Sequence, residues 1–169
     1  ARELGIQTLC IVPYYYIPEQ LGLTYETQLR EELGTPAFSW RGFHHETSGI
    51  DPELFAAQLR TYRERLGSLT DFAYLPLTEE QYRTWFTDPV APVRLPACTN
   101  VERLIDIQPT GEANFCVDFP DYSMGNVRES TIEELWNGAR ARRFREHRRE
   151  KLLSACHRCG ARHMSEIGA

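Results

Sequence analysis

Short apolar runs alternate with helical hydrophobic periods through the first half of the chain. The expected elements, in order, are a strand at 8–13, a helix at 24–33, a strand at 37–43, a helix at 51–66, a strand at 71–77 and a short helix at 78–86. A helix between successive strands connects parallel neighbours and packs outside their sheet. The pattern therefore predicts an α/β unit with a parallel sheet.

Residues suited to helix ends support these boundaries. Gly34 follows the last apolar position of the first helix, where a glycine C-cap is common. Asp51-Pro52 suits the N-cap and first turn of the second helix, and Gly67 suits its end. Thr78-x-x-Gln81 has the form of a capping box, which predicts the start of the third helix.

The proline-rich stretch 88–97 predicts a boundary between two domains. Three prolines in ten positions disfavour both a helix and a central strand. We therefore expect one domain at residues 1–90 and a second at 91–169. Beyond the boundary, the runs 101–107 and 113–119 flank a Pro-Thr-Gly turn and predict a β-hairpin.

Two helices are expected after the hairpin. Ser130-x-x-Glu133 predicts the start of a short helix that ends near Trp136. Asn137 can cap a second helix that runs to about Lys151. The second domain is thus a small α+β unit, built from a β-hairpin plus helices.

Composition and charge limit the class of protein. The chain has 169 residues, of which 41% are hydrophobic and 25% charged, as in soluble globular proteins. A net charge of −5 argues against general nucleic-acid binding, although basic residues gather at 139–162. No apolar run approaches membrane-spanning length and no secretory signal is present, so we expect a cytoplasmic protein without membrane contact. The chain begins at Ala1 rather than Met, which suggests part of something longer.

Four of the five cysteines carry the candidate chemistry. Cys98, Cys116, Cys156 and Cys159 have the spacing C-x17-C-x39-C-x2-C, whereas Cys10 stands alone in an apolar run and is expected to be buried. Two residues between thiols allow a tight turn to direct both sulfurs to one centre. Clustered thiols without an export signal favour a metal or iron–sulfur site over disulfides. The spacing alone leaves zinc and an iron–sulfur cluster open.

A longer pattern surrounds these cysteines. It comprises Cys98, Gly111 and Cys116, the stretch Met124-Gly125-Asn126-Val127-x-Glu129-Ser130-Thr131-Ile132-x-Glu134-Leu135-Trp136-Asn137, the pair Phe144-Arg145, and Cys156-x-x-Cys159. Residues 98–163 therefore resemble the auxiliary-cluster region of radical S-adenosylmethionine enzymes. That region is called SPASM when it holds two [4Fe–4S] clusters and twitch when it holds one.

The resemblance implies one [4Fe–4S] cluster on Cys98, Cys116, Cys156 and Cys159. The two-cluster form has a further cysteine about six residues after its CxxC, where this chain has Ser165. Zinc could occupy the same thiolates in samples prepared in air. The family's catalytic C-x3-C-x2-C is absent, because Cys10 is the only cysteine before Cys98. S-adenosylmethionine and a second [4Fe–4S] cluster would therefore belong to the complete enzyme only.

By the same resemblance, the first domain looks like the last strand–helix units of a partial (β/α) barrel. A complete barrel needs about 250 residues, so residues 1–97 can supply only about three units. The chain would then be the C-terminal portion of a radical S-adenosylmethionine oxidoreductase, inactive alone. Its auxiliary cluster would relay an electron or organise the active site. Its partners would be the missing N-terminal core and a peptide or small-molecule substrate.

A function of another class stays open. The four cysteines could form a structural zinc site in a non-catalytic interaction module, whose contact surface would be the basic helix. The arginines of that helix are otherwise expected to form a solvated face: Arg140, Arg142, Arg143, Arg145, Arg148 and Arg149.

Several further side chains are weaker candidates. His44 and His45 lie at the end of an expected strand, where barrel enzymes place functional groups, but adjacent strand residues face opposite sides and chelate poorly. The run Tyr14–Tyr16 could line the same pocket, although rim packing is the simpler interpretation. His157 and His163 flank the thiols and are expected to be exposed or to support the ligands.

Overall fold

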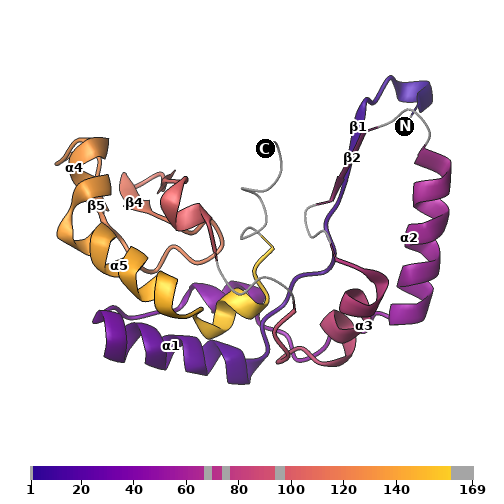
Figure 1. Cartoon of the computed structure of the whole chain (residues 1–169), viewed down its shortest axis with the longest axis horizontal. Helices are drawn as coiled ribbons and strands as arrows, with labels where there is room; N and C mark the ends of the chain where they lie inside the picture. The colour runs from indigo at the N-terminus through magenta and orange to yellow at the C-terminus, as the bar shows by residue number, and fades with distance from the viewer. Residues whose placement is uncertain (1, 67–69, 74–76, 94–97, 161–169) are drawn as a thin grey trace.

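Two groups of elements make up the computed structural model, which describes residues 2–66, 70–73, 77–93 and 98–160 (Figure 1). The first group contains β1 (Thr8–Ile11), α2 (Pro52–Leu66), β2 (Thr70–Ala73) and α3 (Glu79–Thr87). The second contains α1 (Glu19–Leu33), β3 (Asp106–Ile107), β4 (Glu112–Asn114), β5 (Gly125–Asn126), α4 (Ile132–Asn137) and α5 (Ala139–Glu150). Four short 3-10 helices are η1 (Arg2–Leu4), η2 (Ser39–Phe43), η3 (Asn100–Glu102) and η4 (Ser154–His157). The architecture is mixed helix and sheet, and none of the described helices is long and apolar enough to cross a bilayer.

The first group contains a parallel strand pair. β1 pairs with β2 in register from Thr8 opposite Thr70 to Ile11 opposite Ala73. The strand expected at 71–77 begins at Thr70, and residues 74–76 lie outside the described part of the chain. This parallel pair confirms two of the three strands expected before residue 90.

The helix starts of the first group agree with their sequence signals. Asp51 Oδ1 accepts the backbone N–H groups of Glu53 (2.9 Å) and Leu54 (3.2 Å) at the start of α2. The Thr78–Gln81 capping box is present at the start of α3. Gly67, the expected end of α2, lies outside the described residues.

The strand expected at 37–43 is wrong, because residues 39–43 form the 3-10 helix η2. Asp121 Oδ1 accepts the backbone N–H groups of Phe38 (3.0 Å) and Ser39 (3.1 Å), which turns the chain away from an extended path. Trp40 is buried and packs against Gly22 of α1. Directly after this segment, an isolated parallel bridge joins His44 to Ile17.

Cys10 is exposed, so the expectation that it is a buried hydrophobe is wrong. In β1 the residues alternate between partly buried and exposed, with Leu9 and Ile11 on the covered face. Val12, just beyond the strand, is 58% exposed. The face that carries Cys10 is thus open to solvent, whereas the sequence pattern of β1 suits burial on both faces.

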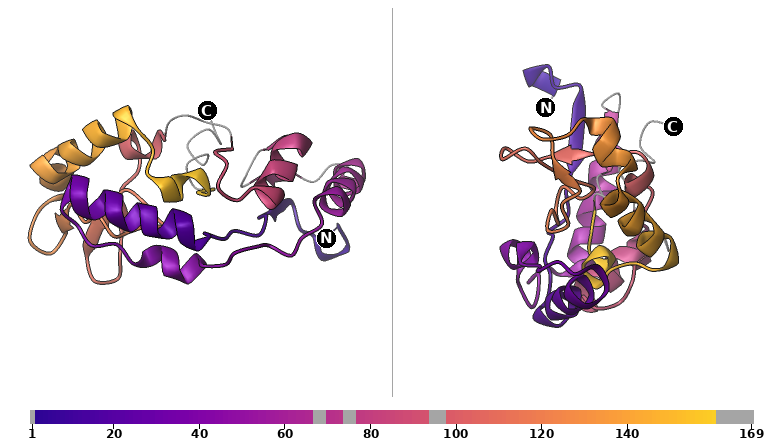
Figure 2. Two further views of the ribbon diagram at one scale, coloured as in Figure 1. Left: turned by 90° about the horizontal axis from the view of Figure 1, so that it is seen from below. Right: turned by 90° about the vertical axis from the view of Figure 1, so that its left-hand side faces the viewer.

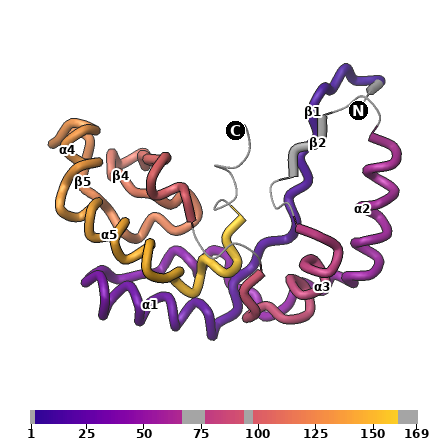
Figure 3. Tube along the Cα trace, viewed as in Figure 1, coloured from indigo at the N-terminus to yellow at the C-terminus, as the bar shows by residue number. Residues whose placement is uncertain are grey.

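Helix α1 belongs to the second group, although it lies before α2 in the sequence (Figures 1 and 3). It begins at Glu19, earlier than expected, and ends at Gly34, whose φ of 68° confirms the left-handed C-cap. Its buried residues Leu21, Tyr25 and Leu29 join the core that holds Phe115. Figure 2 shows α1 running beside α5 along the base of this group.

The second group confirms the hairpin, with shorter strands than expected, and adds β5 as a third antiparallel strand. The helix starts differ by one residue from the sequence signals. Thr131, not Ser130, caps α4, because its hydroxyl accepts the N–H of Glu134 while the Glu134 carboxylate accepts the N–H of Thr131. Gly138, not Asn137, is the N-cap of α5, and it has no side-chain cap.

Candidate metal centre

Three segments bring Cys98, Cys116, and the pair Cys156 and Cys159 to one small cavity. The other lining residues are Asn100, Val101, Phe115, Val117, Asp118, Phe119 and Arg148. Cys98 precedes η3, Cys116 follows β4, Cys156 lies in η4 and Cys159 follows η4. Cys156 is buried and the other three are partly buried. The structure thus brings together residues that are up to 61 positions apart in the sequence.

Asn114 and Phe115, the two residues before Cys116, fix its position. The Oδ1 atom of buried Asn114 accepts the backbone N–H of Cys116 at 3.0 Å. Phe115 is buried, with its ring 5.6 Å from Trp136 and 5.5 Å from Phe144 between centroids. Two residues of the motif, Trp136 and Phe144, therefore hold the end of β4, and with it Cys116, by packing on Phe115.

Glycine at position 125 is required by the close approach of α4 to the small sheet. Its φ is 136°, and a Cβ there would lie 2.6 Å from Leu135 Cδ2. Asn126 Nδ2 donates to Thr110 O and to Glu112 Oε1, both at 3.2 Å. The Gly125-Asn126 pair therefore joins the hairpin turn to α4, which explains its place in the motif physically.

The CxxC pair sits on a turn anchored to α1. The N–H of Cys156 donates to Leu153 O at 2.9 Å, and the N–H of Cys159 donates to Cys156 O at 3.3 Å. At the start of η4, the backbone N–H of Ser154 donates to Gln28 Oε1 (2.8 Å) and its hydroxyl donates to Leu21 O (2.8 Å), both on α1. The turn expected between the two thiols is therefore present.

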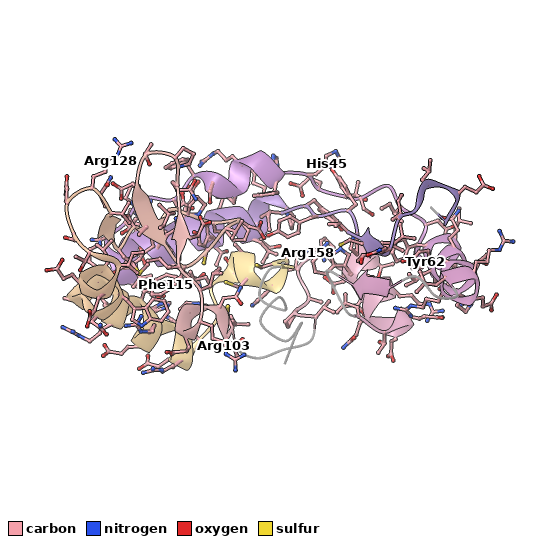
Figure 4. All side chains as sticks on the ribbon, turned by 90° about the horizontal axis from the view of Figure 1, so that it is seen from above. His45, Tyr62, Arg103, Phe115, Arg128 and Arg158 are labelled. Carbon is pink, nitrogen blue, oxygen red and sulfur yellow. The ribbon has the colours of Figure 1, made fainter. Side chains whose placement is uncertain are left out.

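Arg158, inside the CxxC, connects this turn to the first group of elements (Figure 4). It is fully buried, and its Nη1 donates to Trp85 O at 2.7 Å. The guanidinium carbon lies 3.6 Å from the centroid of the Trp85 ring and 4.5 Å from that of Tyr16. Burial lowers the pKa of Arg158 to about 10, which leaves it charged at neutral pH.

Burial disfavours free thiolates in this cavity. It raises the pKa of Cys98 and, more strongly, that of Cys116, with the negative charge of Cys156 adding to both. Asp118 also has a raised pKa because it is buried, and its Oδ2 accepts the Cys159 thiol at 3.7 Å. Without a cation or metal centre, burial therefore favours the protonated thiols of Cys98 and Cys116 over their thiolates.

Arg148 supplies positive charge beside the thiols. It is 3% exposed and lines the cavity. Burial lowers the pKa of Arg148, but the charges of the four thiolates raise it by more, so the net shift is upward. The helical period places Ala141, Phe144 and Arg145 on the same buried face of α5. The expectation of a solvated arginine face is therefore wrong for Arg145 and Arg148, and the i, i+3, i+4, i+7 spacing is the signal that would have shown it.

The weaker candidates lie outside this cavity. His44 Nε2 is 3.1 Å from Glu46 Oε1, and the His45 ring meets Tyr14 edge-on at 6.3 Å. Neither histidine lines the cysteine cavity. Tyr16 is buried beneath Arg158, which agrees with a packing role. His157 is partly buried beside Arg158, and His163 lies outside the described residues.

Four thiols are metal-binding side chains shared by this cavity. Among the described residues, no group of three or more His, Cys, Asp and Glu side chains is arranged to hold a single metal. A tetrahedral zinc site needs every sulfur about 2.3 Å from the same ion. A [4Fe–4S] cluster also takes four thiolates but places each on a different iron, so it joins a wider set of sulfurs. Four cysteines around one cavity, with a buried guanidinium beside them, fit a cluster of this kind.

Residues 98–160 match the family model of SPASM, an iron–sulfur cluster-binding domain. All four candidate cysteines fall within this segment, which is somewhat more than a third of the chain. Searches of curated proteins and of solved structures gave no match. The SPASM match indicates iron–sulfur cluster binding by this part of the chain.

Proposed function

We propose that the chain binds one [4Fe–4S] cluster through Cys98, Cys116, Cys156 and Cys159, as the auxiliary cluster of a radical S-adenosylmethionine oxidoreductase. The convergence of these four cysteines on one cavity carries the proposal. The SPASM match over residues 98–160 supports the type of cofactor. The cluster would supply one-electron transfer, and with four protein thiolates it would have no free iron for substrate. Its role would then be electron relay or organisation of the active site.

Anaerobic reconstitution of the full chain with iron and sulfide tests the cluster. We expect about four iron and four sulfide per chain and a broad absorbance near 400 nm, as for one [4Fe–4S] centre. Cys116→Ser should lose most of the iron, because it removes a thiolate from the buried part of the site. Cys10→Ser is the matched control and should keep full iron content, because Cys10 is exposed on β1.

Two results would contradict the assignment. One is an iron content in Cys116→Ser equal to that of the unaltered chain. The other is one zinc per chain in protein purified without oxygen, persisting after iron and sulfide are supplied. That second result would favour the zinc interaction module over the cluster.

We further propose that an N-terminal radical S-adenosylmethionine core completes the first group of elements. Parallel sheets are normally covered on both faces. Here the Cys10 face of β1 is open, and within the described residues β1 and β2 pair only with each other. The strand pair would be the end of a partial (β/α) barrel, and the complete enzyme would act on a peptide or small molecule. A C-x3-C-x2-C encoded upstream of Ala1 would support this proposal, and an upstream sequence without one would contradict it.

A further inference from the structure

Arg148 is a buried cation that borders the cysteine cavity, and its guanidinium is only partly hydrogen-bonded. Arg148 Nη1 donates to Lys151 O at 2.7 Å. Its Nη2 is also buried and has no hydrogen-bond partner among the described residues. A buried, incompletely bonded guanidinium is costly unless a negative group meets it. The cavity that Arg148 shares with four cysteines is where such a group would lie.

The neighbouring charges do not satisfy Arg148. Asp118 lines the same cavity, but its Oδ2 accepts the Cys159 thiol at 3.7 Å. Arg145 also has a buried nitrogen, Nη1, without a hydrogen-bond partner among the described residues, but it stacks on Trp136 at 4.9 Å and does not line the cavity. Arg149 pairs with Glu102 at 2.9 Å. Of the six arginines in α5, all within the described residues, only Arg148 lines the cavity.

We propose that Arg148 is the counter-charge of the cluster: its guanidinium meets the anionic centre, helps to retain it and raises its reduction potential. This inference rests on the cluster proposed above. A [4Fe–4S] centre with four thiolates is anionic and gains one more negative charge on reduction. A fixed positive charge at low dielectric therefore stabilises the reduced form more than the oxidised form. Arg148 thus acts on the reduction potential of the cluster through its charge and takes no part in the electron transfer itself.

The test compares reduction potentials of the reconstituted full chain. The variants are Arg148→Gln, which removes the charge, Arg148→Lys, which keeps a charge, and Arg149→Gln, the exposed neighbour, as control. Each is titrated with dithionite under nitrogen while the reduced cluster is followed by electron paramagnetic resonance. At the midpoint of the unaltered chain, we expect about a tenfold lower ratio of reduced to oxidised cluster in Arg148→Gln, equivalent to 59 mV for one electron. The midpoint potential of Arg148→Lys should lie closer to that of the unaltered chain, and the midpoint potential of Arg149→Gln should equal that of the unaltered chain.

Iron content and circular dichroism separate the remaining outcomes. Loss of iron in Arg148→Gln, with iron retained in Arg148→Lys and Arg149→Gln, also supports the proposal. An unchanged midpoint and iron content in Arg148→Gln overturn it, as does an Arg148→Lys midpoint as low as that of Arg148→Gln. Before reconstitution, the circular dichroism spectrum of Arg148→Gln should match that of the unaltered chain. A spectrum that shows misfolding would instead indicate a structural role for Arg148 and overturn the proposal. If the unaltered chain binds no cluster, the proposed function itself fails, which differs from any result specific to Arg148.

Discussion

Gly22 of α1 lies where the helix meets the indole of Trp40. Trp40 is 3% exposed, and its Nε1 donates to Glu26 Oε1 at 2.8 Å on the same helix. A Cβ at position 22 would overlap the indole ring. This contact attaches η2 to α1 and so fixes the path between the two groups of elements.

Gly22→Ala should destabilise the chain. Alanine favours a helix interior by about 1 kcal/mol over glycine, but overpacking a buried aromatic ring costs about 1–3 kcal/mol. We expect a net decrease of about 1 kcal/mol in the free energy of unfolding, measured by urea denaturation. Gly42→Ala is the control, because a Cβ there meets no atom within 4 Å. A Gly22→Ala chain as stable as Gly42→Ala would show that Trp40 moves aside freely.

At the scale of the element, the capping box of α4 decides where the helix after the small sheet begins. Glu134 has a lowered pKa because its carboxylate accepts the backbone N–H and the hydroxyl of Thr131. The helix is short, so its start determines the placement of Leu135 and Trp136, which pack in the core. Trp136 in turn contacts Phe115, the residue before Cys116.

Thr131→Ala should cost about 1 kcal/mol of stability, the usual cost of removing an N-cap hydroxyl. Ser130→Ala is the matched control, because the sequence pattern predicts Ser130 as the N-cap whereas the structure has Thr131 there. We expect its effect to stay within about 0.5 kcal/mol. Equal losses in the two variants, in the same denaturation assay, would mean that the cap is shared or lies elsewhere.

At the scale of the whole molecule, Arg158 is the buried link between the cysteine cavity and the first group of elements. Its neighbours Cys156 and Cys159 border the cavity, while its own side chain bonds to Trp85 O and stacks on the Trp85 and Tyr16 rings. The core of the first group includes Trp85, Tyr82 and Leu59. The side chain of Arg158 therefore joins the CxxC turn directly to Trp85 of α3.

Arg158→Met should loosen α3 relative to the rest of the chain. The substitution keeps some apolar packing but leaves the buried Trp85 carbonyl without this donor, which costs about 1–3 kcal/mol. We expect faster amide hydrogen exchange in residues 79–87, measured by mass spectrometry. Arg128→Met changes an exposed arginine and should leave exchange there unaltered. Equal exchange in both variants would contradict the link.

The sequence by itself determined much of the local structure and the candidate thiols. Helix periods and caps such as Asp51 and Thr78 act through neighbouring backbone groups, so they can be read from the sequence. The cysteine spacing and surrounding motif selected four thiols that the fold brings to one cavity.

Only the tertiary structure decided the features that depend on distant partners. The chain turns into the 3-10 helix at 39–43 because Asp121, about eighty positions away, accepts the backbone N–H groups of Phe38 and Ser39 at its start. Cys10 is exposed because no described element covers its face of β1. Arg148 and Arg158 are buried because aromatic rings, backbone carbonyls and the cysteine cavity surround them. Burial of a charge is set by what the fold places around it, and that environment cannot be read from the residue type.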